Sequence, residues 1–282
     1  MASAFDAPTG LARRGRRLSD RETEQRMLRA AVAMVSRTGL TVSLEHISFE
    51  DIIRDADVAR SAVYRRWPHK DLFFVDLVKE LARNATPTIV TDEQELIRQI
   101  VAAHQDWLET PRSRHDLIIE LFRQLSLFDF QTLHGSPEWR TYLALHATFL
   151  SIADGELRDQ VEAALGQSEH DHIGRVARSW ERLAGLLGYR LRPELGATFE
   201  TVATLVDAAM RGLVITALSM PSVAAYRAQV SPFGAAGAEE WSLPALGLAS
   251  IGLAFLEPDP SFEWDDERAA SLARSLAGPP DP

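Results

Sequence analysis

Residues 48–73, SFEDIIRDADVARSAVYRRWPHKDLF, constrain the fold of this chain more than any other segment. Ser48 and Asp51 have the spacing of a helix N-cap with an acidic partner three residues on, which predicts a short helix over residues 49–56. A second short helix is predicted over residues 59–66. Because only two residues separate these helices, a tight turn must join them.

Asp57 lies in this turn, where the backbone needs a left-handed or strained conformation that glycine would adopt more easily. Pro68 interrupts the second helix, and a longer helix is predicted from there over residues 69–83. Upstream, apolar residues at helical spacing predict another helix over residues 20–38, which Gly39 ends. The two short helices and their turn are therefore expected to pack against the helix over residues 20–38 as a three-helix unit, and the helix over residues 69–83 follows it.

The rest of the chain also carries helical patterns. No segment alternates polar and apolar residues as a half-buried strand does, so the fold is predicted to be all-α. Further helices are predicted over residues 92–109, 113–130, 137–152, 155–165, 168–188, 194–219, 222–230, 243–256 and 264–276, with a loop over residues 231–240.

Charge divides the chain into two parts. Residues 1–83 hold 15 Lys and Arg against 12 Asp and Glu, a net +3, whereas the remainder holds 15 against 28, a net −13. An acidic body repels phosphate, so contact with nucleic acid is expected only in the N-terminal part. The expected domains are a flexible basic arm (1–19), a helical domain (20–83) and a second helical domain (84–282).

Composition narrows the class of protein. The absence of cysteine excludes disulfides, thiolate metal sites and cysteine nucleophiles. The first twelve residues lack the continuous apolar core that an export signal needs, so none is expected, and the apolar run 245–256 is shorter than the ~20 residues of a membrane span. We therefore expect a cytoplasmic protein with no membrane partner.

Motifs for catalysis are also missing. The sequence has no G-x-S-x-G elbow, no phosphate loop and no H-E-x-x-H motif, so neither an enzyme nor a catalytic residue nor a cofactor is predicted. His170 and His172 would point to different faces of a helix, which is poor spacing for metal ligands. No metal site is predicted.

The second short helix has a face suited to DNA. Its apolar residues can pack against the helix over residues 20–38, which leaves small residues and arginines on the outside. Tyr64 and Lys70 are better placed for phosphate oxygens than for base edges. The expected DNA-contacting residues are Ala59, Arg60, Ser61, Ala62, Tyr64, Arg65 and Lys70, with Arg13, Arg14, Arg16 and Arg17 of the basic arm reaching phosphates or the minor groove.

The segment VARSAVYRRWPHKDLF resembles the recognition helix and following residues of the TetR family of bacterial transcriptional regulators. The matching features are the Tyr64/Trp67 pair, the Pro68-x-Lys70-acid segment, Ile52 and the Ala-x-Val turn at 56–58. The resemblance covers about residues 20–80. It departs from the family's pattern at Asp57, where glycine is usual, at Trp67 in place of phenylalanine, and in a Gly39-to-Ile52 connection about four residues longer.

The resemblance implies a helix-turn-helix domain followed by a C-terminal helical bundle for ligand binding and dimerisation. It implies a homodimer on a pseudo-palindromic double-stranded operator, with a small-molecule effector that controls the spacing of the two recognition helices, and more often repression than activation. Ser48 falls on a small hydroxylated position that commonly meets a phosphate in this family. Three readings remain open beside it: a surface helix that is merely solvated, a helical small-molecule-binding protein that has lost sequence-specific DNA binding, and an enzyme built on the C-terminal bundle, although no motif predicts one.

The C-terminal part offers candidates for an interface and a pocket. The helices over 194–219 and 243–256 are rich in apolar and small residues, which suits close packing in a dimer; internal core is the alternative, but the interface is favoured because a dimer needs an apolar surface. Large aromatic side chains on the central helices could line a pocket, and Asp207 and Arg211 could pair or meet a ligand. The candidate pocket residues are Trp107, Phe122, Trp139, Phe149, Trp180, Asp207 and Arg211.

Overall fold

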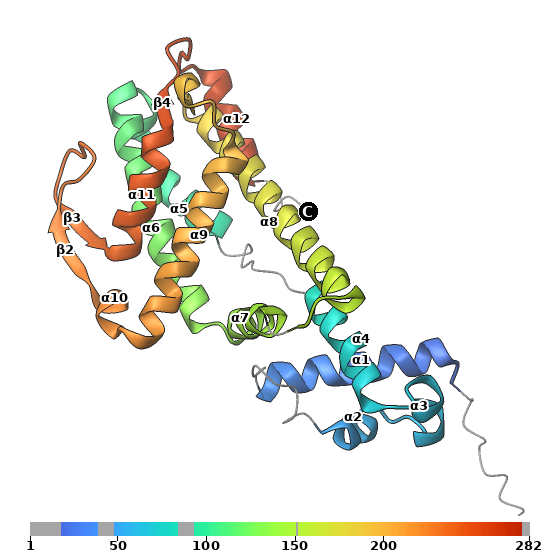
Figure 1. The fold of residues 1–282 in the computed structure, drawn as a ribbon. Helices are drawn as coiled ribbons and strands as arrows, with labels where there is room; N and C mark the ends of the chain where they lie inside the picture. Colours follow the sequence, from blue (N-terminus) through green and yellow to red (C-terminus); the bar gives the residue numbers. More distant parts are fainter. Residues whose placement is uncertain (1–17, 39–47, 84–92, 151, 278–282) are drawn as a thin grey trace, which may run out of the picture. The chain divides into compact units, whose positions relative to one another are not determined.

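The computed structural model describes residues 18–38, 48–83, 93–150 and 152–277. The chain divides into two compact units, residues 1–81 and 82–282, which are described separately below. Both are mainly helical, as the sequence predicts (Figure 1). The basic arm and the connection at 39–47 lie outside the described residues.

The N-terminal unit contains α1 (Asp20–Thr38), α2 (Phe49–Asp55), α3 (Arg60–Arg66) and most of α4 (Lys70–Arg83). These bounds confirm the four predicted helices to within one residue at most ends. Helix α1 packs against both α2 and α3 (Figure 1).

The core of this unit is built from apolar side chains of α1, α2, α3 and α4 and from Trp67, which follows α3. Ile52, Val63, Trp67 and Phe73 are fully buried or nearly so. Trp67 packs edge-on against Phe73, with ring centroids 5.1 Å apart. Val63 is the one buried residue of α3, while Ala62 and Arg66 are half-buried and the other residues of the helix are exposed.

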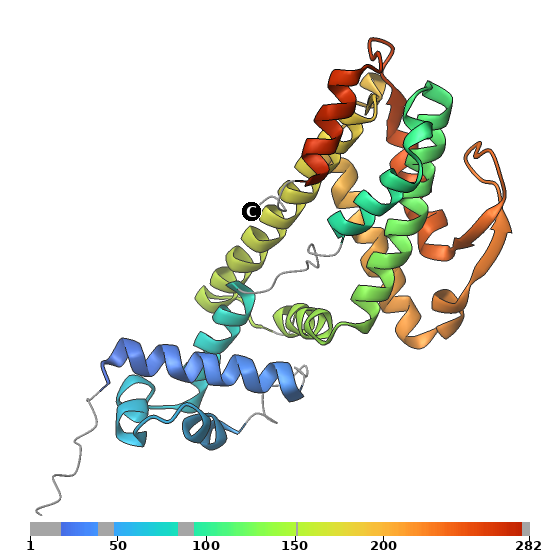
Figure 2. The ribbon, with the colours of Figure 1, turned by 180° about the vertical axis from the view of Figure 1, so that it is seen from behind.

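The C-terminal unit is a helical bundle whose centre is formed by α6, α8, α9 and α11. Helix α11 packs against both α6 and α9, and α8 packs against α9; α12 lies along α8 and α5 (Figure 2). The helices are α5 (Glu93–Ala103), α6 (Pro111–Gly135), α7 (Pro137–Leu150), α8 (Glu156–Leu186), α9 (Phe199–Ser219), α10 (Pro221–Ala225), α11 (Leu243–Phe255) and α12 (Asp266–Ala277).

Several helix predictions were wrong in their bounds: α5 ends at Ala103 and not at 109, α6 extends to Gly135 and not to 130, and α9 begins at Phe199 and not at 194. Helix α8 is continuous through Gly166, where the sequence suggested a break, because glycine without a neighbouring proline can keep helical geometry. The helix predicted over 222–230 ends at Ala225, since Tyr226 adopts an extended backbone, and strand β2 (Arg227–Val230) follows.

Four short strands form two antiparallel pairs, which the search for alternating patterns missed. Strand β2 pairs with β3 (Glu239–Ser242), and β1 (Tyr189–Leu191) pairs with β4 (Leu256–Pro258). Strands of three or four residues are too short to show alternation. The β1–β4 pair ties the C-terminal ends of α8 and α11 together. The unit remains mainly helical.

Helix α9 is the one helix of the described ranges that is long and apolar enough to cross a membrane. Its buried residues, among them Val202, Met210 and Val214, pack into the core of the bundle. The core helix of a globular bundle has this composition too. Helix α11 is also a core helix, because Ala245, Leu248 and Ala249 are buried inside its own subunit.

Candidate functional site

The outward face of α3 carries the predicted DNA-contacting residues. Arg60, Ser61, Tyr64 and Arg65 are exposed, and Ala62 is half-buried beside them. Ala59 is exposed as well and forms the N-cap of α3. The structure therefore brings these residues together on one short helix, with small side chains between the arginines.

The turn before α3 depends on Asp57. This residue has φ of +50°, in the left-handed region that favours glycine. The backbone N–H of Asp57 donates to the carbonyl of Arg54 at 3.2 Å. The expected strain is thus present at this position, and it allows α2 and α3 to join through four residues.

Glu50 of α2 holds two side chains of the α3 face. Its carboxylate lies 2.6 Å from an Nη atom of Arg60 and accepts a hydrogen bond of 3.0 Å from the hydroxyl of Tyr64. That hydrogen bond raises the pKa of Tyr64 above its usual value. Glu50 therefore orients a cation and a phenol on the same surface, while placing a negative charge between them.

The two arginines at the end of α3 differ in their surroundings. Arg65 is exposed at the edge and pairs with Asp20 at the start of α1. Arg66 turns inward, where it pairs with Glu24 at 3.3 Å and Asp76 at 3.2 Å. Only Arg65 keeps a guanidinium at the rim of the outward face.

Trp67 has a structural role in the N-terminal unit. Its ring is fully buried, and Nε1 donates to the carboxylate of Asp76 at 2.9 Å. Asp76 also accepts from Arg66, so one carboxylate ties the end of α3 to α4. This bond fixes where α4 begins, and with it the position of Lys70.

The remaining predicted DNA-contacting residues differ in exposure, and four of them are not described by the structure. Lys70 is exposed as the first residue of α4. The side chain of Ser48 caps α2 by accepting from the backbone N–H of Asp51 at 3.2 Å, and Ser48 is only half-exposed. Arg13, Arg14, Arg16 and Arg17 lie outside the described residues.

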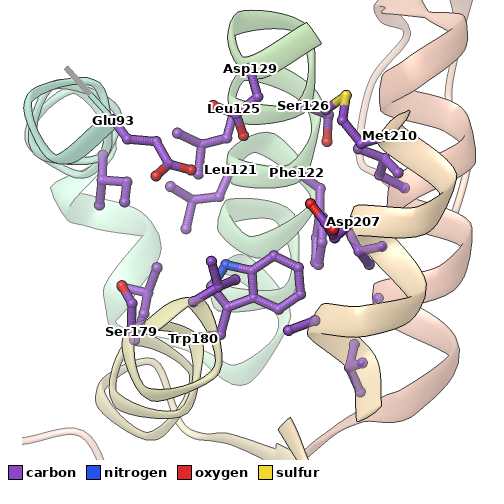
Figure 3. A pocket seen from close by; sticks show the side chains of 18 of the residues that line it. Glu93, Leu121, Phe122, Leu125, Ser126, Asp129, Ser179, Trp180, Asp207 and Met210 are labelled. Carbon is purple, nitrogen blue, oxygen red and sulfur yellow. The ribbon is translucent and has the colours of Figure 1, made fainter. Parts of the chain in front are cut away.

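The C-terminal unit contains a cavity of about 240 Å³ enclosed by α5, α6, α8, α9 and α11 (Figure 3). Its wall is largely apolar. Three of the predicted pocket residues, Phe122, Trp180 and Asp207, line it, and the rings of Phe122 and Trp180 meet edge-on with centroids 6.3 Å apart. A site for a small organic molecule is usually a cavity of this kind.

The other predicted pocket residues lie elsewhere. Trp139 is buried in the core, and Trp107 packs beside His104 with ring centroids 4.2 Å apart. Phe149 lies under the guanidinium of Arg158, 4.5 Å from it. These aromatics are not among the residues that line the cavity, because helical spacing marks apolar faces without distinguishing a packed core from a hollow one.

Two carboxyls in the cavity were missed. Glu93 of α5 and Asp129 of α6 both line it, and a side-chain hydrogen bond joins them. Burial raises the pKa of both groups, and the neighbouring Glu93 raises that of Asp129 further. The sequence signal was Asp129 itself, a carboxyl in the middle of the apolar run LSLFDF.

Arg211 is the centre of a polar cluster and does not line this cavity; together with Asp207 it lines a second pocket beside α8 and α9. It pairs with Asp207 at 2.7 Å, as the four-residue spacing suggested, and forms a two-point contact with Glu169 at 2.7 and 2.9 Å. Although burial works against its charge, these carboxylates raise the pKa of Arg211. Tyr142 hydrogen-bonds both Arg211 and Glu169, which connects α7 to α8 and α9.

Within the described ranges, no three His, Asp or Glu side chains gather as metal ligands would. His172 instead lies 3.5 Å from Asp207, on the cavity side of the polar cluster. The chain matches no protein-family model, and comparison with curated proteins and with solved structures found no similar one.

Proposed function

We propose that this chain is a ligand-responsive, DNA-binding transcriptional regulator that acts as a repressor. The observation that carries this proposal is the outward face of α3, where arginines alternate with small side chains and only Val63 is buried. A helix of this kind can enter the major groove, since small residues let the backbone approach the bases.

The side chains of this face divide by task. Arg65 is placed for guanine or phosphate, and Ala62 for a thymine methyl. Tyr64 and Lys70 suit phosphate oxygens, which set the register of the protein on the duplex without reading sequence. The exposed start of α4 at Lys70 extends the positive surface beyond α3.

A homodimer on a pseudo-palindromic operator follows from the size of the reading element. One seven-residue helix reaches few base pairs, so two copies about one helical turn apart are needed for specificity. Helix α9 provides an apolar surface for this contact: Leu205 and Ile215 are 44% and 48% exposed, and Ala208 and Gly212 lie exposed between them. Their spacing puts all four on one helical face.

The cavity of the C-terminal unit is the proposed effector site. A ligand that binds better to the conformer with badly spaced recognition helices lowers operator affinity by that preference, typically about 1–3 kcal/mol. This mechanism places the protein in the cytoplasm, where its DNA is.

The proposal is tested with the full chain and the DNA upstream of its own gene in a gel-shift assay. We expect a complex that excess unlabelled fragment removes and unrelated DNA does not. Arg60→Ala should weaken this complex, while Arg29→Ala, an exposed arginine of α1, should not. A complex equally sensitive to both DNAs would contradict the proposal.

The second candidate is a small-molecule-binding protein without sequence-specific DNA binding. The observation that favours it is the neutralisation of the α3 face, since Arg60 and Arg65 already have carboxylate partners in Glu50 and Asp20. Such a protein would bind ligand in the cavity, and its gel shift would show no selective complex.

A further inference from the structure

The cavity contains charge that its apolar walls do not explain. Three carboxyls, Glu93, Asp129 and Asp207, line a space otherwise walled mainly by leucine, valine and aromatic side chains. Figure 3 shows Glu93 and Asp129 reaching toward each other from α5 and α6, with the ring of Trp180 extending across the cavity from α8. An ionised carboxyl in such surroundings is costly unless a cation meets it.

Asp207 already has its cation. Arg211 lies 2.7 Å from it, and His172 lies 3.5 Å away on the other side. Its charge is therefore balanced by the polar cluster and is not available to a ligand without breaking that cluster.

The carboxyl pair of Glu93 and Asp129 differs from Asp207, because the two carboxyls share a proton and have no arginine partner among the described residues. A hydrogen bond between two carboxyls requires one of them to be protonated, and burial raises the pKa of both groups, which favours the protonated form. Among the described residues, no lysine or arginine forms an ion pair with either carboxyl. Burial raises the pKa of Glu93, whereas the hydrogen bond to Asp129 and the nearby His172 lower it.

We infer that the cavity binds an apolar organic cation, a protonated amine whose ammonium group lies between the Glu93–Asp129 pair and the aromatic rings of Trp180 and Phe122. The ammonium would replace the shared proton as the partner of both carboxylates, and the ring faces attract the same charge. The hydrocarbon part would lie among residues such as Leu121 and Leu125. This inference rests on the proposed function, because it names the chemical class of the effector.

The binding step has a defined proton balance. The carboxyl pair loses its shared proton to solvent, and the two carboxylates then share the N–H donors of the ammonium; no covalent bond forms or breaks between protein and ligand. Up to one proton leaves per ligand bound, so the affinity for an amine should rise as pH rises through the elevated pKa of Asp129. A neutral ligand of the same shape would release none.

Arg175 also lines the cavity, from α8, and would favour an anion instead. The cavity wall therefore carries both signs of charge, with the carboxyl pair on α5 and α6 and the arginine on α8. The sign of the preferred ligand charge decides between them.

Calorimetric titration of the full chain with three probes of one shape tests the inference: 4-phenylbutylamine, neutral pentylbenzene and 4-phenylbutyrate. We expect the amine to bind at least about tenfold tighter than either other probe. Repeating the titration in two buffers with different heats of ionisation should show proton release for the amine. Tighter binding of the butyrate, or no binding of phenylalkylamines with one to six methylenes, would overturn the inference.

Variants assign the effect to the carboxyl pair. Glu93→Gln and Asp129→Asn keep the shape of each side chain and should each weaken amine binding by about tenfold, with proton release lost. Glu95→Gln, on the exposed side of α5, should change neither. Equal binding by all variants would contradict the placement of the ammonium. Because no DNA is present, failure here leaves the gel-shift result standing, and the reverse also holds.

Discussion

Gly252 of α11 lies so close to the ring of Phe122 that a Cβ atom at Gly252 would come to 2.6 Å from Cε1 of Phe122. Side chains do not tolerate such a contact, so any larger residue at this position must displace the ring. Phe122 lines the cavity of the C-terminal unit. The volume of the cavity therefore depends on the absence of a Cβ atom at Gly252.

Gly252→Ala should push the ring of Phe122 into the cavity and close it to ligands. Amine binding should weaken by about tenfold or more, since reopening the cavity would cost about 1–3 kcal/mol of overpacking. Calorimetric titration measures this. Gly247→Ala on the same helix is the matched control, because its Cβ would lie 3.8 Å from Leu213, an ordinary contact. Unchanged binding by Gly252→Ala would contradict the position of Phe122.

Glu50→Gln should strengthen DNA binding by about two- to fivefold at low salt. The substitution releases Arg60 and Tyr64 from a carboxylate whose exposed ion pair is worth about 0.2–1 kcal/mol. Fluorescence anisotropy with the operator fragment measures the change. A weaker complex would show instead that Glu50 positions these side chains for binding.

Arg65→Ala and Lys70→Ala should differ in kind. Loss of Arg65 should cost roughly 1–3 kcal/mol on the preferred sequence or relax base preference, whereas loss of Lys70 should weaken all sequences alike and lower the salt slope by about 1. Titrations at several salt concentrations on preferred and unrelated duplexes separate the two. If neither variant differs from the parent, the assignment of α3 as the reading helix is wrong.

Asp57→Gly and Asp57→Ala should have opposite effects on stability. Glycine adopts a φ of +50° without steric cost, whereas alanine would pay roughly 1–2 kcal/mol there. Urea unfolding followed by circular dichroism should give a higher midpoint for the glycine variant than for the alanine variant. Identical midpoints would mean that the turn is not strained.

The Glu93–Asp129 pair should make the stability of the ligand-free protein fall as pH rises. A carboxyl whose pKa is raised by folding stabilises the native state fully below its unfolded pKa, about 3.9 for Asp, and that stability is lost through the raised value. Asp129→Asn removes this titration, so its advantage in melting temperature over the parent should grow from pH 5 to pH 8. Glu95→Gln should show no such trend.

The helices of the N-terminal unit could be predicted because their signals are local. A capping residue at Ser48 and a breaker at Pro68 fix the bounds within a few positions. The left-handed backbone at Asp57 followed from the shortness of the turn. The outward face of α3 could then be identified from the positions of the apolar residues in that one helix.

The cavity could not be predicted in the same way. Glu93 and Asp129 meet across two helices, 36 positions apart, and no local pattern indicates such a pairing. Strands β1 and β4 likewise pair across more than 60 residues. Phe122 and Trp139 look alike in sequence, on apolar faces of neighbouring helices, yet one lines a cavity and the other is packed in the core.

Selection of bound duplexes from a random DNA library by the full chain tests the central claim most directly. The account predicts enrichment of an inverted repeat, with half-sites about one helical turn apart, and loss of that enrichment in Arg65→Ala. A library that stays random after several rounds, or an enriched sequence that Arg65→Ala selects equally well, would contradict the claim that α3 reads DNA.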